Sequence, residues 1–172
     1  MSSEEYPQGG NVAAQRKAAS ILMGISYVLG AVGIYFGFAN VSGGTSQQFA
    51  LFVLLAVGGP TVAGFIRHFF LWHGDAQRLG FEAKDPSWMW EVAFANLAIA
   101  LGAILTVALS WGVRAQAAVT IIMGVYMLGA AFVHIMSWRS KSADERRSPF
   151  MHIGLPLIYG IVLLYVAFKG AA

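Results

Sequence analysis

The sequence contains no cysteine in its 172 residues. This absence excludes disulfide bonds, thiolate nucleophiles, zinc–thiolate sites and iron–sulfur clusters. Charged residues are also scarce, at 11% of the chain, whereas globular domains carry about 25%. With 58% apolar residues and a mean hydropathy of +0.65, the composition does not suit an ordinary cytosolic enzyme, a disordered protein or a nucleic-acid-binding protein. It predicts an integral membrane protein whose first partner is the lipid bilayer.

The sequence also lacks two short motifs that would point to nucleotide binding or to serine hydrolysis. It has no glycine-rich phosphate loop that ends in lysine, and no serine in a G-x-S-x-G turn. We therefore do not expect an ATP-driven pump or a serine hydrolase.

Five apolar stretches are long enough to cross the roughly 30 Å of hydrocarbon in a bilayer, which takes about 20 helical residues. They run over residues 18–40, 49–72, 90–111, 116–138 and 151–168. No stretch shows the alternation of a membrane β-strand. The sequence predicts an all-α fold: one five-helix transmembrane domain over residues 18–172, preceded by a polar leader over residues 1–17. It also predicts a charged loop from His73 to Met89 that folds over one mouth of the bundle.

Basic residues predict the orientation of the five spans, because they gather on the cytoplasmic side of a membrane. Eight lie on one side: Arg16, Lys17, Arg78, Lys84, Arg139, Lys141, Arg146 and Arg147. Only Arg114 and Lys169 lie on the other side. We expect a cytoplasmic N-terminus and an external C-terminus. The same loops explain the net charge of +3 without any nucleic-acid partner.

Four side chains that can bind metals fall within the predicted spans near their cytoplasmic ends, and ionisable groups there are costly in a bilayer unless they serve a function. They come from four different helices: His68, Glu91, His134 and His152. His68 lies four residues before Trp72, and His134 lies four residues before Trp138. Both imidazoles are therefore about 6 Å inside the membrane boundary.

Three imidazoles and a carboxylate from facing helices suit iron, zinc, copper or nickel, and two histidines at one depth can hold haem b as axial ligands. We expect the four side chains to be candidate ligands of a transition metal or haem, with His73 as an alternative to His152. Arg67 would supply positive charge to an anionic ligand or a haem propionate. The structural alternative is that these groups reach the headgroups or bond between helices, with Arg67 paired to Glu91.

Asn96 lies deeper in the third span than Glu91. At 100° per residue the two are 140° apart around the helix, so they do not share a face. We expect Asn96 to support the site through a hydrogen bond to a neighbouring helix.

Small residues and one proline mark positions of helix packing. Pro60 follows two glycines at the middle of the second span, where it predicts a kink. Gly33 and Gly37 have the spacing that lets two helices approach closely. The sequence leaves open whether that contact lies within one chain or between two copies.

Several strings resemble a family of small bacterial multi-pass membrane proteins that is catalogued as a domain of unknown function. The resemblance covers residues 65–156 and rests on Ile66-Arg67-His68-Phe69-Phe70, Leu79-Gly80-Phe81, Glu91-Val92-Ala93-Phe94-Ala95-Asn96-Leu97 and Gly129-Ala130-Ala131-Phe132-Val133-His134-Ile135. It implies that His68, Glu91, Asn96 and His134 belong to one motif set, and that the protein lies in a bacterial inner (plasma) membrane. The chain departs from the family pattern at Arg67, Phe81 and His152, where glycine, tryptophan and an acidic residue are usual.

Three hypotheses for the function follow. The first is a redox or metal-handling protein that uses the His and Glu cluster. The second is a non-catalytic subunit of a larger membrane complex, because the chain carries little catalytic equipment. The third is an oligomeric carrier or channel for a small solute, because polar groups and a broken helix lie inside the membrane.

Overall fold

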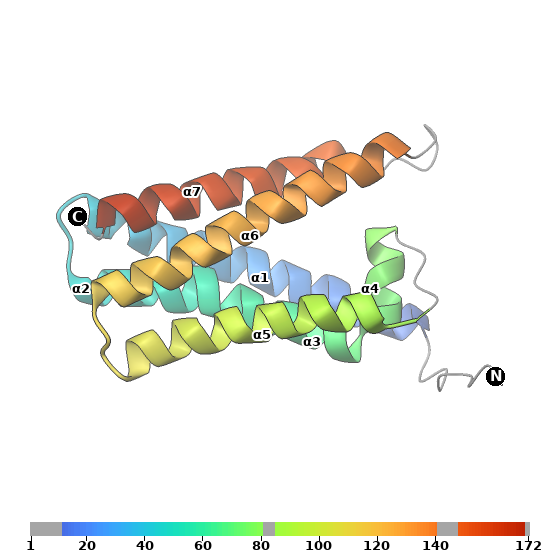
Figure 1. The fold of residues 1–172 in the computed structure, drawn as a ribbon, viewed down its shortest axis with the longest axis horizontal. Coiled ribbons are helices and arrows are strands. Elements are labelled where there is room, and N and C mark those ends of the chain that lie inside the picture. Colours follow the sequence, from blue (N-terminus) through green and yellow to red (C-terminus); the bar gives the residue numbers. More distant parts are fainter. Residues whose placement is uncertain (1–11, 81–84, 141–147, 171–172) are drawn as a thin grey trace.

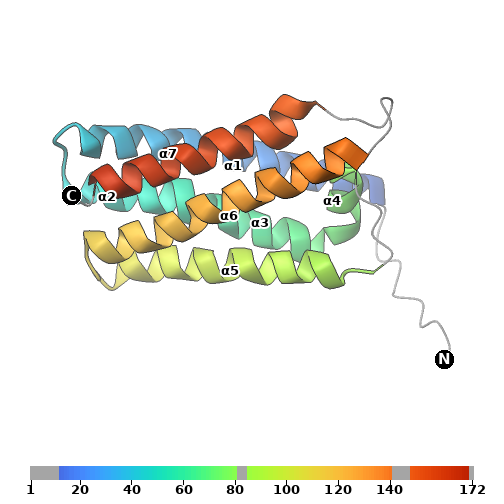
Figure 2. The same ribbon diagram turned by 45° about the horizontal axis from the view of Figure 1, so that its top comes forward.

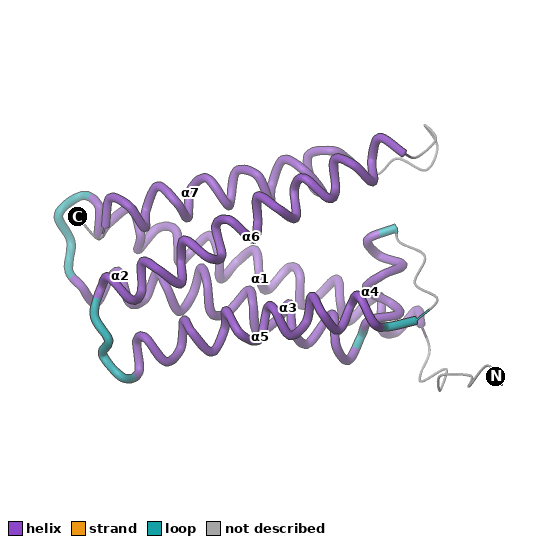
Figure 3. The backbone as a smooth tube through the Cα atoms, viewed as in Figure 1, coloured by secondary structure: helices purple, strands orange, loops and turns teal. Residues whose placement is uncertain are grey.

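The structure is a computed structural model that describes residues 12–80, 85–140 and 148–170. These residues form helices, and no strand occurs among them (Figure 3). In chain order the elements are α1 (Val12–Val41), α2 (Ser46–Phe52), η1 (Val53–Gly58), α3 (Gly59–Phe70), α4 (Trp72–Leu79), α5 (Ser87–Ala108), α6 (Val113–Ser140), η3 (Phe150–Gly154) and α7 (Leu155–Gly170). The segments η1 and η3 are π-helical turns.

Five of the helical stretches are long and apolar enough to cross a membrane, which confirms the predicted fold class. They are Val12–Val41, Ser46–Phe70, Ser87–Ala108, Val113–Ser140 and Phe150–Gly170. The structure has additional helical residues at two places outside the expected spans. Helix α1 already begins at Val12, so residues 12–17 of the expected leader are helical, while residues 1–11 lie outside the described ranges. The expected loop after the second span also contains a helix, α4.

The five spans pack as an elongated bundle (Figure 1). One end carries α4, the start of α1 and the end of α6; we call it the α4 end (Figures 1 and 2). The other carries α2, the end of α7 and the α5–α6 turn, and we call it the α2 end. Helix α3 packs between α1 and α5, while α6 packs on α7 and α5.

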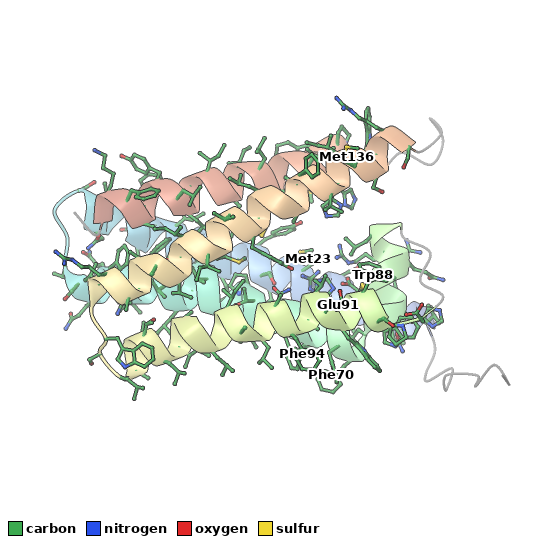
Figure 4. All side chains as sticks on the ribbon, in the orientation of Figure 1. Met23, Phe70, Trp88, Glu91, Phe94 and Met136 are labelled. Carbon is green, nitrogen blue, oxygen red and sulfur yellow. The ribbon has the colours of Figure 1, made fainter. Side chains whose placement is uncertain are left out.

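The apolar core lies mostly toward the α2 end. Phe49, Phe52 and Val53 are fully buried there, together with Leu163 and Val166 of α7. Toward the α4 end the outer face of α3 and α5 carries an aromatic cluster with ring centroids 5.0–6.4 Å apart: Phe65, Phe69, Phe70, Trp90 and Phe94. Phe70 and Phe94 project outward from the bundle (Figure 4). This face therefore lies against lipid.

Gly33 and Gly37 lie at helix contacts within the chain. A Cβ atom at Gly33 would lie 2.4 Å from the backbone nitrogen of Ala56, and one at Gly37 would lie 2.8 Å from the ring of Phe52. Glycine is required at these positions because α1 approaches the second span closely. The close approach that the sequence predicted thus occurs between helices of one chain.

Pro60 is accompanied by a π-helical turn in the preceding residues. Proline cannot donate a backbone hydrogen bond to the residue four positions earlier, which here is Ala56. The backbone N–H of Gly59 instead donates to the carbonyl of Leu54, five residues earlier. The hydroxyl of Thr61 donates to the carbonyl oxygens of Val57 and Gly58, at 2.7 and 3.0 Å. Local side chains therefore satisfy backbone groups that the break in the helix releases.

Candidate functional site

Charged side chains of α3 and α4 meet around one buried carboxylate at the α4 end. Asp75 is 0% exposed, and Arg67 is 7% exposed. The Asp75 Oδ1 atom accepts a hydrogen bond of 2.7 Å from Nε of Arg78 and lies 3.6 Å from Nη1 of Arg67. Its Oδ2 atom lies 2.9 Å from Nδ1 of His68. We call these four residues the Asp75 cluster.

The local sequence brings Asp75 into this position through a sharp turn. Helix α3 ends at Phe70, and α4 starts again at Trp72, with Leu71 between them in a non-helical conformation. Helix α4 then packs closely on α1: a Cβ atom at Gly74 would lie 2.4 Å from the backbone nitrogen of Arg16. The Gly74 backbone N–H also donates to Oε1 of Gln15 at 3.1 Å. Asp75 follows Gly74 directly and is buried by this contact.

Burial by itself would raise the pKa of the Asp75 carboxyl group. The close contact with the His68 imidazole and the positive charges of Arg67 and Arg78 outweigh that effect and hold the pKa well below its usual value. Asp75 is therefore ionised throughout the physiological pH range. The cluster contains two guanidinium groups and one carboxylate, so its net charge is positive even with a neutral imidazole.

Several donor atoms of the cluster have no acceptor in the described part of the chain. Nε and Nη1 of Arg67 are buried without a hydrogen bond, and so is Nη2 of Arg78. The Oδ2 atom of Asp75 and Nδ1 of His68 are buried without a hydrogen bond as well, so three of the five such atoms in the cluster belong to guanidinium groups. The 3.6 Å between Arg67 and Asp75 allows electrostatic attraction but is too long for a hydrogen bond. Buried guanidinium donors normally have partners, so these atoms mark a place that suits a further acceptor.

Asn96 lies nearer the middle of the membrane. It is 5% exposed, and its side-chain nitrogen donates to the carbonyl of Val92 at 2.8 Å and to the Tyr126 hydroxyl at 3.0 Å. A Cβ atom at Gly64 of α3 would lie 2.7 Å from Oδ1 of Asn96. The side chain thus joins α3, α5 and α6, as expected from a polar residue that bonds a neighbouring helix.

Beyond the Asn96–Tyr126 contact, α5 and α6 separate toward the α4 end. Glu91 is exposed, and so is Leu109, which lies 18 residues or five turns later on the same face of α5. Glu91 therefore lies on an outward side of α5, away from the buried Asn96 (Figure 4).

His134 and His152 form a pair, with ring centroids 6.0 Å apart. His134 lies 18 residues, or five turns, after Gln116 on α6 and therefore shares its inward face. Gln116 is buried, whereas His134 is half-buried because the bundle widens at this end. His73 stacks on the ring of Trp72, with centroids 4.7 Å apart.

The structure does not gather the expected ligands into one metal site. Within the described residues, no group of three or more His, Asp or Glu side chains has an arrangement that could hold a metal ion. His68 turns toward Asp75, Glu91 is exposed, and His134 lies with His152. The structural alternative expected Arg67 to pair with Glu91, but Arg67 lies beside Asp75 instead.

Sequence reasoning did not identify Asp75 and Arg78 as site residues because both lie outside the spans, in the charged loop that was expected to fold over one mouth of the bundle. A signal for them was present: Asp75 and Arg78 have the i, i+3 spacing of an ion pair on one helical face. Gly74, next to Asp75, also permits close helix contact.

The sequence matches a family of unknown function (DUF6790) over residues 16–169. The chain belongs to this family. The match covers nearly all of the chain's five spans and confirms the predicted resemblance to a family of unknown function. No curated protein and no solved structure matches the chain. The function of this DUF6790 member must therefore be argued from its site.

Proposed function

We propose that this protein binds a small anionic ligand, or the anionic group of a larger one, at the Asp75 cluster, at the α4 end of the bundle. The observation that carries the proposal is the set of buried guanidinium nitrogens without acceptors, on Arg67 and Arg78. Guanidinium groups recognise carboxylates and phosphates through paired hydrogen bonds. Asp75 occupies only part of this donor capacity and neutralises one of the two positive charges.

This proposal favours the carrier hypothesis among the three that the sequence suggests. We place the protein in a bacterial plasma membrane with the α4 end facing the cytoplasm, on the strength of the basic residues at that end. A ligand at the Asp75 cluster would lie near the cytoplasmic surface. The ligand would then pass along the bundle or between copies of the chain.

Binding of inorganic phosphate to the purified protein in detergent tests the proposal. A ligand that binds only the folded state raises the melting temperature with concentration. We expect sodium phosphate to raise it more than sodium chloride of equal ionic strength. Arg67→Gln should abolish this difference, whereas Arg114→Gln should preserve it, because Arg114 is an exposed residue of the same charge at the α2 end. Equal phosphate responses in both variants would refute the proposal.

Metal binding is a second candidate function, supported by the His134–His152 pair. A metal ion about 2.0–2.1 Å from one nitrogen of each ring would leave the ring centroids roughly 5–6 Å apart, close to the 6.0 Å of the structure.

An absorption spectrum with elemental analysis of the purified protein tests this second candidate. A Soret band would indicate haem, and near-stoichiometric zinc, copper or iron would indicate a metal site. The metal should be lost in His134→Ala and retained in His73→Ala. A metal-free, colourless protein that carries a stoichiometric partner would instead favour the subunit hypothesis.

A further inference from the structure

We propose that this protein assembles with further copies of itself, through the outward side of α5 in one copy and the outward side of α1 in the next. The inference does not depend on the proposed anion site. It rests on two oppositely charged side chains at the same membrane level, Glu91 and Lys17. Both are exposed, and neither forms an ion pair with a described residue.

The position of Glu91 calls for a partner outside its own chain. Helix α5, Ser87–Ala108, has 22 residues and so a length of about 33 Å, whereas the hydrocarbon layer is roughly 30 Å thick. Glu91 lies four residues after the start of the helix, or about 6 Å, so its Cα atom is inside the hydrocarbon layer. Ionisable groups at this depth normally face the interior of a bundle and pair there, whereas Glu91 lies on an outward side. A cation on a neighbouring helix would neutralise it.

The contacts of α3 relate the levels of α1 and α5 in the membrane. A Cβ atom at Gly59 would lie 2.8 Å from Leu29 of α1, and one at Gly64 would lie 2.7 Å from Asn96 of α5. Gly64 is five residues nearer the α4 end than Gly59. Helix α1 runs in the opposite direction to α3, so the same step along α1 leads from Leu29 to Gly24. Gly24 and Asn96 therefore share a level.

The two charges lie at nearly equal distances from this level. Lys17 precedes Gly24 by seven residues, or about 10 Å along the helix. Glu91 precedes Asn96 by five residues, or about 7.5 Å. The two side chains thus differ by about 3 Å in depth, which the length of a lysine side chain covers. All copies lie in one bilayer, so Lys17 of one copy is level with Glu91 of another.

Small residues follow both charges at the same spacing. Helices α1 and α5 both begin at the α4 end, so they run in the same direction (Figures 1 and 2). Gly24 lies seven residues after Lys17, and this step returns to the same helix face within about 20°. Ala98 lies seven residues after Glu91, and it is exposed as Gly24 is. Nothing lies within 4 Å of a Cβ atom at Gly24. Small residues at equal levels let two helices approach closely.

The two surfaces belong to different sides of one bundle, because α3 packs between α1 and α5. They therefore meet only between copies. Each copy offers both surfaces, so the contact is head-to-tail, and such contacts close into a ring where the rotation between copies allows it. This arrangement supplies the assembly that the carrier hypothesis calls for.

Cross-linking tests the contact directly, because the chain has no cysteine that would give a background. Gly24→Cys and Ala98→Cys are placed on separate full-length copies with different tags, which are co-expressed and oxidised in native membranes. We expect a disulfide-linked dimer with both tags, since a disulfide requires Cα atoms within about 7 Å. In the control Val125→Cys replaces Ala98→Cys. Val125 is 57% exposed on α6 and precedes Tyr126, which bonds Asn96 at the same level. Equal dimer yields from the two pairs would overturn the inference.

An exchange of the two charges tests the ion pair. Lys17→Glu and Glu91→Lys each place like charges opposite one another, so each should weaken self-association in detergent about tenfold. Energy transfer between labelled copies measures the association. The double variant restores opposite charges and should regain the wild-type value, whereas Arg114→Gln, at an exposed cation of the α2 end, should change nothing. Unchanged association in the single variants, or no recovery in the double variant, would contradict the pairing.

The outcomes separate this inference from the proposed anion site. Arg67→Gln should leave self-association unchanged, because Arg67 is buried beside Asp75. A wild-type protein that is monomeric but binds phosphate through Arg67 would overturn the assembly and leave the proposed function standing. A different protein or an amine-bearing lipid that is retained through Glu91, without any cross-link between copies, would also overturn it.

Discussion

The phenol of Tyr159 in α7 donates a hydrogen bond to the carbonyl oxygen of Ala56, 103 residues earlier in the chain. Ala56 is the residue whose helical partner would be Pro60, and proline has no N–H to give. Tyr159 also contacts α1, since a Cβ atom at Gly30 would lie 2.9 Å from its hydroxyl oxygen. One side chain thus joins three spans at the point where the second span changes its helical winding.

Tyr159→Phe should destabilise the protein by about 0.5–2 kcal/mol, the range for polar contacts between membrane helices. The substitution leaves the fully buried Ala56 carbonyl without this donor. Unfolding in mixed micelles of increasing denaturing detergent measures the change. Tyr35→Phe is the control, because Tyr35 is 70% exposed and should tolerate the loss of its hydroxyl.

The proline explains the need for Tyr159, and this can be tested with a double variant. Pro60→Ala supplies a backbone N–H that can donate to Ala56. In that background Tyr159→Phe should lower the free energy of unfolding by less than it does in the wild-type protein. The effects of the two substitutions on stability should therefore not be additive. Full additivity would show that the tyrosine does not compensate for the proline.

Gly33→Ala should destabilise the bundle by about 1–3 kcal/mol, because the added methyl group would meet the backbone of Ala56 at 2.4 Å. Gly24→Ala on the same helix is the matched control, since nothing lies within 4 Å of the position that its methyl group would take. Alanine has the higher helix propensity, so Gly24→Ala should be neutral or slightly stabilising. The same unfolding assay applies, and equal losses in both variants would contradict the close contact.

Asp75→Asn should destabilise the protein by about 3–5 kcal/mol, the cost of breaking a buried ion pair by removing one partner. Arg67 and Arg78 would then be buried without a counter-charge. Thermal unfolding in detergent measures the loss. Asp85→Asn, at an exposed carboxylate, should have a smaller effect.

The stability of the wild-type protein should fall in acid through Asp75. Its pKa is lower in the folded state than in the unfolded chain, where it is about 4. The unfolded state therefore takes up a proton first as the pH falls, and the stabilisation, complete above about pH 4, declines below it. As the pH is lowered from 7 to 3, the melting temperature should fall more steeply for the wild-type protein than for Asp75→Asn. Parallel curves would contradict this assignment.

The number of spans could be predicted from the sequence, and so could their ends to within a few residues, except that the first span begins at Val12 rather than at residue 18. The cost of exposing polar groups to hydrocarbon acts on each segment separately. The opposite faces of Glu91 and Asn96 could also be predicted, since helix geometry alone decides them. Whether the four candidate ligands meet could not be predicted. Their depth in the membrane does not show how each helix is rotated or how far apart the helices lie. His68 and His134 share a depth but contact different partners.

The sequence by itself determined a five-span membrane protein with its ionisable groups gathered toward one end. The tertiary structure decided which of those groups meet. Asp75 was hidden in a segment that reads as a polar loop, and it becomes buried only because α4 packs on α1 and α3. This burial arises from contacts between segments distant in the chain, and these contacts are set by packing across the bundle rather than by local hydropathy.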